Sequence, residues 1–103
     1  MWAQLITMRL KPGQEDRVGE MLEQLRAAEQ EGSGIVRHIA MRDDKDSSRF
    51  LMLAVFESEE QARARENDPR RTEGLKAMRE TMAEIMDGPP EFVDLTVFSE
   101  VAY

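Results

Sequence analysis

Residues 50–56 form an unbroken apolar run, Phe-Leu-Met-Leu-Ala-Val-Phe, in a chain that is otherwise rich in polar residues. A strand that is apolar at every position is covered on both faces. The helix and strand signals along the chain follow the order βαββαβ, and right-handed crossovers place both helices of such a chain on one side of its sheet. Nothing from the same chain then covers the other side. We therefore expect a second copy of the sheet to cover it, giving a face-to-face homodimer with interior space for small molecules.

Composition narrows the classes of function. The 103 residues suit a single domain, residues 1–103, with a two-layer core. The formal net charge of −7 argues against a nucleic acid or an anionic membrane surface as partner. The absence of cysteine excludes a disulfide framework and thiolate catalysis. The N-terminus has no signal-peptide pattern and no segment is apolar enough to span a membrane, so we expect a soluble, cytoplasmic protein.

The strands of the expected antiparallel sheet are separated by clear turn and helix signals. They are predicted at residues 2–10, 35–42, 50–56 and 92–101. The polar residues 43–48 are expected to connect the second and third strands, which therefore form a hairpin.

Three helical segments are predicted from apolar spacing and from capping signals. The first helix carries one apolar stripe at helical spacing, formed by Val18, Met21, Leu22, Leu25 and Ala28. The second is short; Ser58 and Gln61 resemble a capping box at its start, and it ends near Pro69. A longer helix follows and stops at Gly88.

His38 is the only histidine in the chain. It lies on the second strand between Val36 and Ala40, so its imidazole could serve as a general base or contact a ligand. The alternative is a structural role, which is more common for a single histidine on a strand. One histidine without a cluster of carboxylates does not make a metal site, so no metal is expected.

Four further side chains are candidates for substrate binding. Arg37 and Arg9 lie on strands, where a guanidinium can hold an anionic oxygen, or where it can form a salt bridge at the sheet rim. Asp94 shares a strand face with Thr96; it would act as a base if desolvated, or it would pair with an arginine. Trp2 could stack on a planar ligand, or it could fill the core or an interface.

Five short segments carry a resemblance to a known family through their order and spacing. They are Lys11-Pro12-Gly13, Gly34-Ile35-Val36-Arg37, Ser48-Arg49-Phe50, Phe56-Glu57-Ser58-Glu59-Glu60-Gln61-Ala62 and Asp87-Gly88-Pro89-Pro90. Over nearly its full length the chain resembles the antibiotic biosynthesis monooxygenase-like superfamily. The resemblance implies a ferredoxin-like βαββαβ domain, two of which pair their sheets in a dimeric α+β barrel. It does not fix the activity, because the superfamily includes monooxygenases without metal or flavin, haem-degrading enzymes and isomerases.

The chain departs from the superfamily at functional positions. The haem-degrading branch uses an asparagine, a tryptophan and a histidine where this sequence holds Ile6, Arg65 and Leu75. Many other members resemble a pattern of histidine, three residues, proline and histidine, which here begins at Arg65 and ends at Arg70. The comparison implies that no haem or other cofactor is used. It also leaves His38 as the one side chain that titrates near neutrality, apart from any perturbed carboxylate.

Two functions of different classes stay open. In the first, the protein is a cofactor-independent monooxygenase or isomerase whose apolar cavity holds a small planar organic substrate. His38 then takes a proton, and Arg65 or Arg37 stabilises the resulting anion. In the second, it is a non-catalytic small-molecule-binding or accessory protein of the same fold. The first hypothesis predicts that His38→Ala abolishes turnover, and the second predicts binding without conversion.

Overall fold

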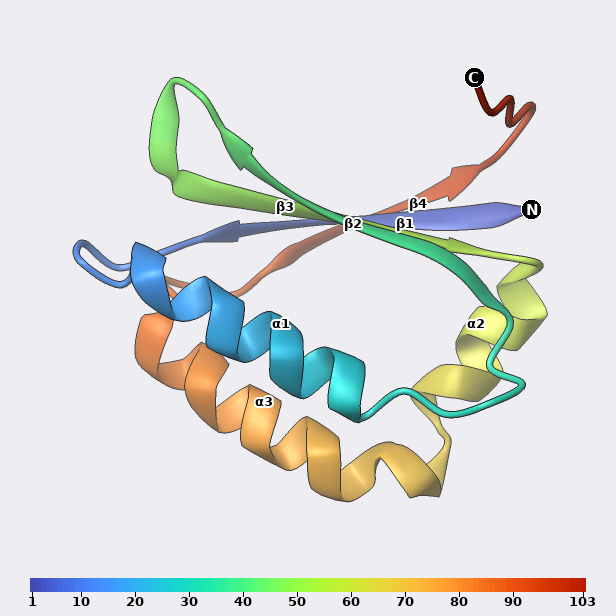
Figure 1. Cartoon of the computed structure of the whole chain (residues 1–103), viewed down its shortest axis with the longest axis horizontal. Helices are drawn as coiled ribbons and strands as arrows, with labels where there is room; N and C mark the ends of the chain where they lie inside the picture. The colour runs from blue at the N-terminus through green and yellow to red at the C-terminus, as the bar shows by residue number, and fades with distance from the viewer.

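The computed structural model describes all residues 1–103 and confirms the ferredoxin-like α+β fold (Figure 1). The elements are β1 (Trp2–Arg9), α1 (Val18–Ala27), β2 (Ile35–Asp43), β3 (Asp46–Phe56), α2 (Glu59–Glu66), α3 (Thr72–Ile85) and β4 (Glu91–Thr96). Two single-turn 3-10 helices, η1 (Glu15–Arg17) and η2 (Pro69–Arg71), lead into α1 and α3. All neighbouring strands are antiparallel, and their order in the sheet is β2-β3-β1-β4.

The helices all lie on one side of the sheet, as the crossover rule requires (Figure 1). The main core fills the space between this side and the helices α1 and α3; its buried members are Met8, Leu10, Met21, Phe50, Met52, Ile85 and Met86. A smaller cluster lies near α2 and contains Trp2, Ala54, Phe56 and Ala62. The two long helices approach closely where Gly74 faces Ala28, since a Cβ on Gly74 would lie 2.7 Å from the Ala28 Cβ.

No helix covers the opposite side of the sheet (Figure 1). We call it the open face. The strand registers place one apolar residue of each strand side by side across it: Ile39, Leu53, Leu5 and Val93. Ile39 is 39% exposed and Val93 is 48% exposed. The apolar run at 50–56 therefore sends alternate side chains into the core and onto the open face.

Two strand boundaries differ from the prediction. Within residues 43–48, only residues 44–45 form the turn, because β2 continues to Asp43 and β3 begins at Asp46. The polar residues there are satisfied locally: the Asp46 carboxylate accepts hydrogen bonds from the backbone N–H and the hydroxyl of Ser48. The fourth strand ends at Thr96 instead of residue 101. Its neighbour β1 begins at Trp2, so after the bond from the Val97 N–H to the Met1 carbonyl no backbone is left to pair.

The helix ends follow the sequence signals. Ser58 caps α2, and its Oγ accepts a hydrogen bond of 3.1 Å from the Gln61 N–H. Pro69 begins the single turn η2, whose N–H at Arg70 is capped by the Asp68 side chain. None of the helices is long and apolar enough to cross a membrane.

Candidate functional site

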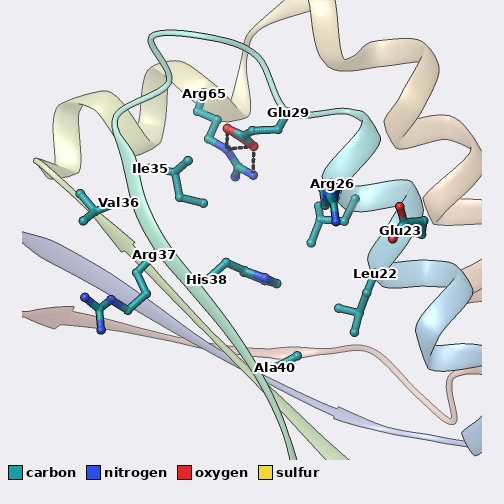
Figure 2. Close-up of a pocket in the computed structure, with 11 residues that line it drawn as sticks. Leu22, Glu23, Arg26, Glu29, Ile35, Val36, Arg37, His38, Ala40 and Arg65 are labelled. Atoms are coloured by element: carbon teal, nitrogen blue, oxygen red, sulfur yellow. Dashed lines mark hydrogen bonds and ion pairs between the residues drawn. The ribbon is translucent and has the colours of Figure 1, made fainter.

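A pocket of about 460 Å³ lies on the helix side of the sheet, between α1 and the edge strand β2, with α2 at one end (Figure 2). Its apolar lining comes from α1 and β2 and consists of Leu22, Leu25, Ile35, Val36 and Ala40. Its polar lining consists of Glu23, Arg26, Glu29, Arg37, His38 and Arg65. The pocket thus joins an apolar wall to six polar or charged side chains, a mixture that can hold and orient a small molecule.

The pocket exists because α1 and α3 pack over the central strands while β2 lies at the sheet edge. On β2 the residues that face the helices are small or polar. Ala40 pairs with the buried Met52 and His38 pairs with the buried Ala54, so neither fills the space below α1. The helix-facing side chains of β2 therefore leave space below α1, whereas those of β3 pack into the core.

His38 points from β2 towards α1 and into the pocket (Figure 2). Partial desolvation by the surrounding atoms lowers the pKa of its imidazole below the ordinary 6.5. The positive charge of Arg65 lowers the pKa further, and the negative charge of Glu29 partly opposes this. A neutral imidazole at neutral pH can accept a proton, as a general base must.

Arg65 lies at the far end of the pocket, where a carboxylate holds it in place. Its Nε and Nη2 donate to Glu29 at 2.7–3.1 Å, which is the bidentate geometry of a strong arginine–carboxylate pair (Figure 2). Its guanidinium also lies over the ring of Phe56, at 5.5 Å from the ring centroid. The Arg65 side chain is 13% exposed and that of Glu29 is 26% exposed. Nη1 makes no hydrogen bond within the chain and remains available to a ligand.

Burial on its own would raise the pKa of Glu29, but hydrogen bonds from Arg65 and Ser33, together with the positive charges of Arg65 and Arg71, outweigh burial and lower the pKa instead. Glu29 is therefore a carboxylate at neutral pH, and the Glu29–Arg65 pair carries no net charge. The sequence reasoning did not select Glu29. A signal was present, since Glu29 follows Leu22 by seven residues and so continues the apolar stripe of α1.

A second arginine fixes the end of α2 that carries Arg65. Arg71, in η2, is only 4% exposed, and its Nη1 donates to the backbone carbonyl of Arg65 at 3.1 Å. Burial lowers the pKa of Arg71 from its usual value, and its Nε has no partner. No sequence signal distinguishes Arg71 from its neighbour Arg70, which is exposed and paired with Asp68.

Arg37 is beside His38 in sequence but belongs to the other side of the sheet. It pairs in register with Val55, and its guanidinium points away from the pocket interior (Figure 2). Its Nη2 lies 3.4 Å from a carboxylate oxygen of Glu100 in the C-terminal segment. Only the edge of the pocket includes Arg37.

The other three predicted binding residues lie outside this pocket. Arg9 donates to Asp46 and Ser48 at the base of the β2–β3 hairpin, and the hydrogen bonds from Ser48 and Arg9 lower the pKa of Asp46 to about 2. Trp2 and Asp94 share one partner, Arg63. This guanidinium lies 4.9 Å from the Trp2 ring centroid and donates to Asp94 at 2.9 Å. These residues make the core and surface pairs that we gave as their alternative roles.

No group of three or more histidine, cysteine, aspartate or glutamate side chains is arranged to hold a metal ion. Ile6 and Leu75, at the positions of the haem-degrading trio, belong to the interior: Ile6 packs against the main core and Leu75 is buried in α3. The polar chemistry of the pocket therefore rests on His38 and on the Glu29–Arg65 pair.

The sequence model of one family, antibiotic biosynthesis monooxygenase, matches residues 1–80. No curated protein matches the sequence. Among solved structures, a variant of SnoaB, a cofactor-independent oxygenase from Streptomyces nogalater, is similar with a TM-score of 0.75 at 15% identity, covering 99% of this chain and 97% of its own. A protein of unknown function from Nitrosomonas europaea gives a TM-score of 0.75 at 21% identity, with coverages of 99% and 93%. PA3566 from Pseudomonas aeruginosa gives 0.70 at 15% identity, with coverages of 95% and 94%. At these identities the structural likeness shows a common fold.

Proposed function

Since the chain belongs to the antibiotic biosynthesis monooxygenase family, we propose that it is an oxygenase that uses no cofactor and acts on a small planar organic substrate. The substrate would lie in the pocket between α1 and β2. The observation that carries the proposal is that the only histidine and the partly free guanidinium of Arg65 line the same pocket, beside an apolar wall. The fold shared with SnoaB, a cofactor-independent oxygenase, supports it.

In this proposal His38 removes a proton from a CH2 group that is activated by a neighbouring carbonyl and aromatic rings. The carbanion passes one electron to O2, and the resulting radical pair combines to a peroxide. Loss of water then leaves a new carbonyl. One oxygen atom enters the product and the other leaves as water with the two hydrogens of the CH2 group, so no external reductant is consumed.

Arg65 would stabilise the negative charge that develops on the substrate carbonyl oxygen. Its free Nη1 is the donor for this, while Glu29 holds the rest of the guanidinium. A preorganised donor of this kind contributes on the order of a few kcal/mol to the transition state in a site that excludes water.

The test is O2 consumption with anthrone, a planar ketone with an activated CH2 group, followed with an oxygen electrode. We expect His38→Gln to reduce the rate by roughly 100-fold or more, since it removes the general base. Arg42→Gln is the matched control, because Arg42 is an exposed residue of the same strand that does not line the pocket. Equal rates for wild type and His38→Gln would eliminate His38 as the base. An isomerase using the same base would convert a substrate without consuming O2.

The second candidate is a non-catalytic binding or accessory role. It is favoured by the state of the buried cation in the pocket, because Arg65 is already paired with Glu29. Under this alternative, anthrone binds but the purified protein forms no product. Product formation that scales with protein concentration would exclude it.

We also infer that two chains associate through their open faces to form a homodimer. The apolar row across all four strands supports this, because monomers rarely leave such a contiguous surface in water. Exposed apolar side chains continue into the C-terminal segment at Phe98, Val101 and Tyr103. The pocket lies on the helix side of the sheet, so the dimer contact and the proposed substrate site use opposite faces.

A further inference from the structure

Arg71 is a buried cation without a carboxylate partner. The residue is 4% exposed, and the one hydrogen bond of its side chain runs from Nη1 to the Arg65 carbonyl at 3.1 Å. Its Nε is buried without any partner. An arginine does not give up its proton in a protein, so this charge stays inside the fold. Because burying a charge without a counter-charge is costly, we looked for its role in the adjoining site.

The two carboxylates whose charges act on Arg71 are already paired with other arginines. Glu29 accepts from Arg65 at 2.7 Å, and Asp68 accepts from Arg70 at 2.7 Å. Burial lowers the pKa of Arg71, the charge of Arg65 lowers it further, and the two carboxylates oppose this. Three guanidiniums therefore share two carboxylates, and one positive charge in this cluster is left uncompensated.

The exposed charges of the pocket lining do not remove this excess. Arg26 and Glu23 have opposite signs, and neither takes part in an ion pair. Water screens exposed charges strongly, so these two have little net influence on a ligand inside the pocket. Arg37, at the pocket edge, is paired with Glu100. The uncompensated charge of the buried cluster is therefore the one that most affects a bound ligand.

Arg65 is the cation of the cluster that lines the pocket (Figure 2). Glu29 occupies its Nε and Nη2 at 2.7–3.1 Å, and Nη1 makes no hydrogen bond. One free nitrogen donor suits a single charged oxygen, such as that of a phenolate or an enolate. His38 lines the same pocket and can exchange the proton of such a compound.

We propose that the pocket binds planar aromatic compounds as oxygen anions, phenolates or enolates, and that Arg71 sets this preference by acting through Arg65. The inference rests on the proposed function, since it places the substrate in the pocket between α1 and β2. The anionic oxygen accepts from Nη1 of Arg65, and the nearby charge of Arg71 favours the anion over the neutral compound. The enolate that a ketone forms when it loses a proton to His38 is stabilised in the same way. Arg71 is thus a positioning residue that does not touch the substrate.

The test uses 4-nitrophenol, a planar probe whose neutral and ionised forms have the same shape and differ in colour. Absorbance gives the pKa of the bound probe, and the imidazole NMR signals of His38 report the binding of either form. Above pH 6.5 the imidazole is largely neutral and Glu29 is ionised, so the probe is the group that titrates. We expect the phenolate to bind tighter than the phenol by roughly tenfold or more, which lowers the pKa of the probe on binding.

Three variants separate the charge of Arg71 from its packing. Arg71→Met removes the charge and should reduce the preference for the phenolate by roughly fivefold or more. Arg71→Lys keeps a positive charge without the fork of donors, and should keep most of the preference. Arg70→Met makes the same change at the adjacent exposed arginine, which is paired with Asp68, and should leave the preference unchanged.

A fourth variant tests the charge of the cluster without altering Arg71. Glu29→Gln removes one of the two carboxylates, so the excess positive charge grows and the preference for the phenolate should increase. This measurement decides the question even if Arg71→Met does not fold. A weaker preference in Glu29→Gln would contradict the inference.

The outcomes distinguish this inference from the proposed function. If wild type binds the phenol as tightly as the phenolate, the inference is wrong while the pocket remains a binding site. An unchanged preference in Arg71→Met, or an equal loss in Arg71→Met and Arg71→Lys, would show that the charge of Arg71 does not set it. If the probe shifts no His38 signal at saturating concentration, the pocket does not take planar aromatic molecules, and both proposals fail.

Discussion

At the scale of single residues, the acid–base chemistry of the pocket depends on how the Glu29–Arg65 ion pair changes the pKa of His38. Desolvation and the charge of Arg65 lower the pKa of His38, and Glu29 raises it. Glu29 follows α1 and Arg65 belongs to α2, so neither charged residue lies on the strand that carries His38. The proton affinity of the imidazole is therefore set by two other segments of the chain.

The titration of His38 gives the prediction at this scale. We expect an imidazole pKa below 6.5 in wild type, a higher pKa in Arg65→Gln and a lower pKa in Glu29→Gln, because the charges removed have opposite signs. NMR can measure it without assignment, since no other histidine is present. Arg37→Gln should leave the pKa unchanged. A shift of the same sign in Arg65→Gln and Glu29→Gln would contradict this account.

The same shift predicts the effect of pH on stability. The pKa of His38 is lower in the folded chain, so the unfolded chain binds the proton more tightly. Above about pH 6.5 the imidazole is largely neutral in both states, and protonation does not oppose folding. As the pH falls from that value through the lower folded-state pKa, protonation of the unfolded chain lowers the free energy of unfolding. Chemical denaturation of wild type and His38→Gln across this interval should show a smaller decline for the variant. An equal decline would mean that the imidazole has the same pKa in both states.

At the scale of elements, the sequence predicted the order and type of every helix and strand, together with most of their boundaries. The capping residue Ser58 and the break at Pro69 appear where their side-chain chemistry requires them. The end of β4 was not predictable from its own residues, because apolar side chains continue through residue 98. Its end is set by the start of β1, which lies at the other end of the sequence.

Helix packing gives a prediction with an internal control. Gly19 in α1 has open space where a Cβ would stand, so Gly19→Ala should stabilise the fold by roughly 0.5–1 kcal/mol. Gly74 in α3 has the Ala28 Cβ at 2.7 Å from that position, so Gly74→Ala should destabilise it by about 1–3 kcal/mol. Urea unfolding of the two variants measures both. Stabilisation by Gly74→Ala would show that α1 and α3 do not pack as closely as described.

At the scale of the whole molecule, all the helices lie on one side of the sheet, so no helix covers the open face. The helix side holds the main core and the pocket, while the open face holds an apolar row that its own chain does not cover (Figure 1). Burial of this row between two copies would remove it from water and leave both pockets accessible from the helix sides.

Two adjacent residues of β4 test this assembly. Val93 lies on the open face and is 48% exposed, whereas Phe92 lies on the helix side and is 58% exposed. In sedimentation experiments we expect a dimer for wild type and for Phe92→Lys, and a monomer for Val93→Lys, because a lysine within the interface would be buried without a partner. A monomeric wild type, or a dimeric Val93→Lys, would refute the open face as the interface.

Local sequence patterns were sufficient to predict the one-sided βαββαβ architecture. Apolar periodicity, caps and turns act over a few residues, and the order βαββαβ leaves few ways to arrange the elements. The sequence also indicated His38 as a base and left Arg65 and Arg37 as alternative cations. The packing of distant elements settles which side chains share the pocket: it joins Arg65 to Glu29, 36 positions away, and turns Arg37 to the other face. An ion pair between distant elements depends on how those elements pack, and no local pattern in the sequence specifies that packing.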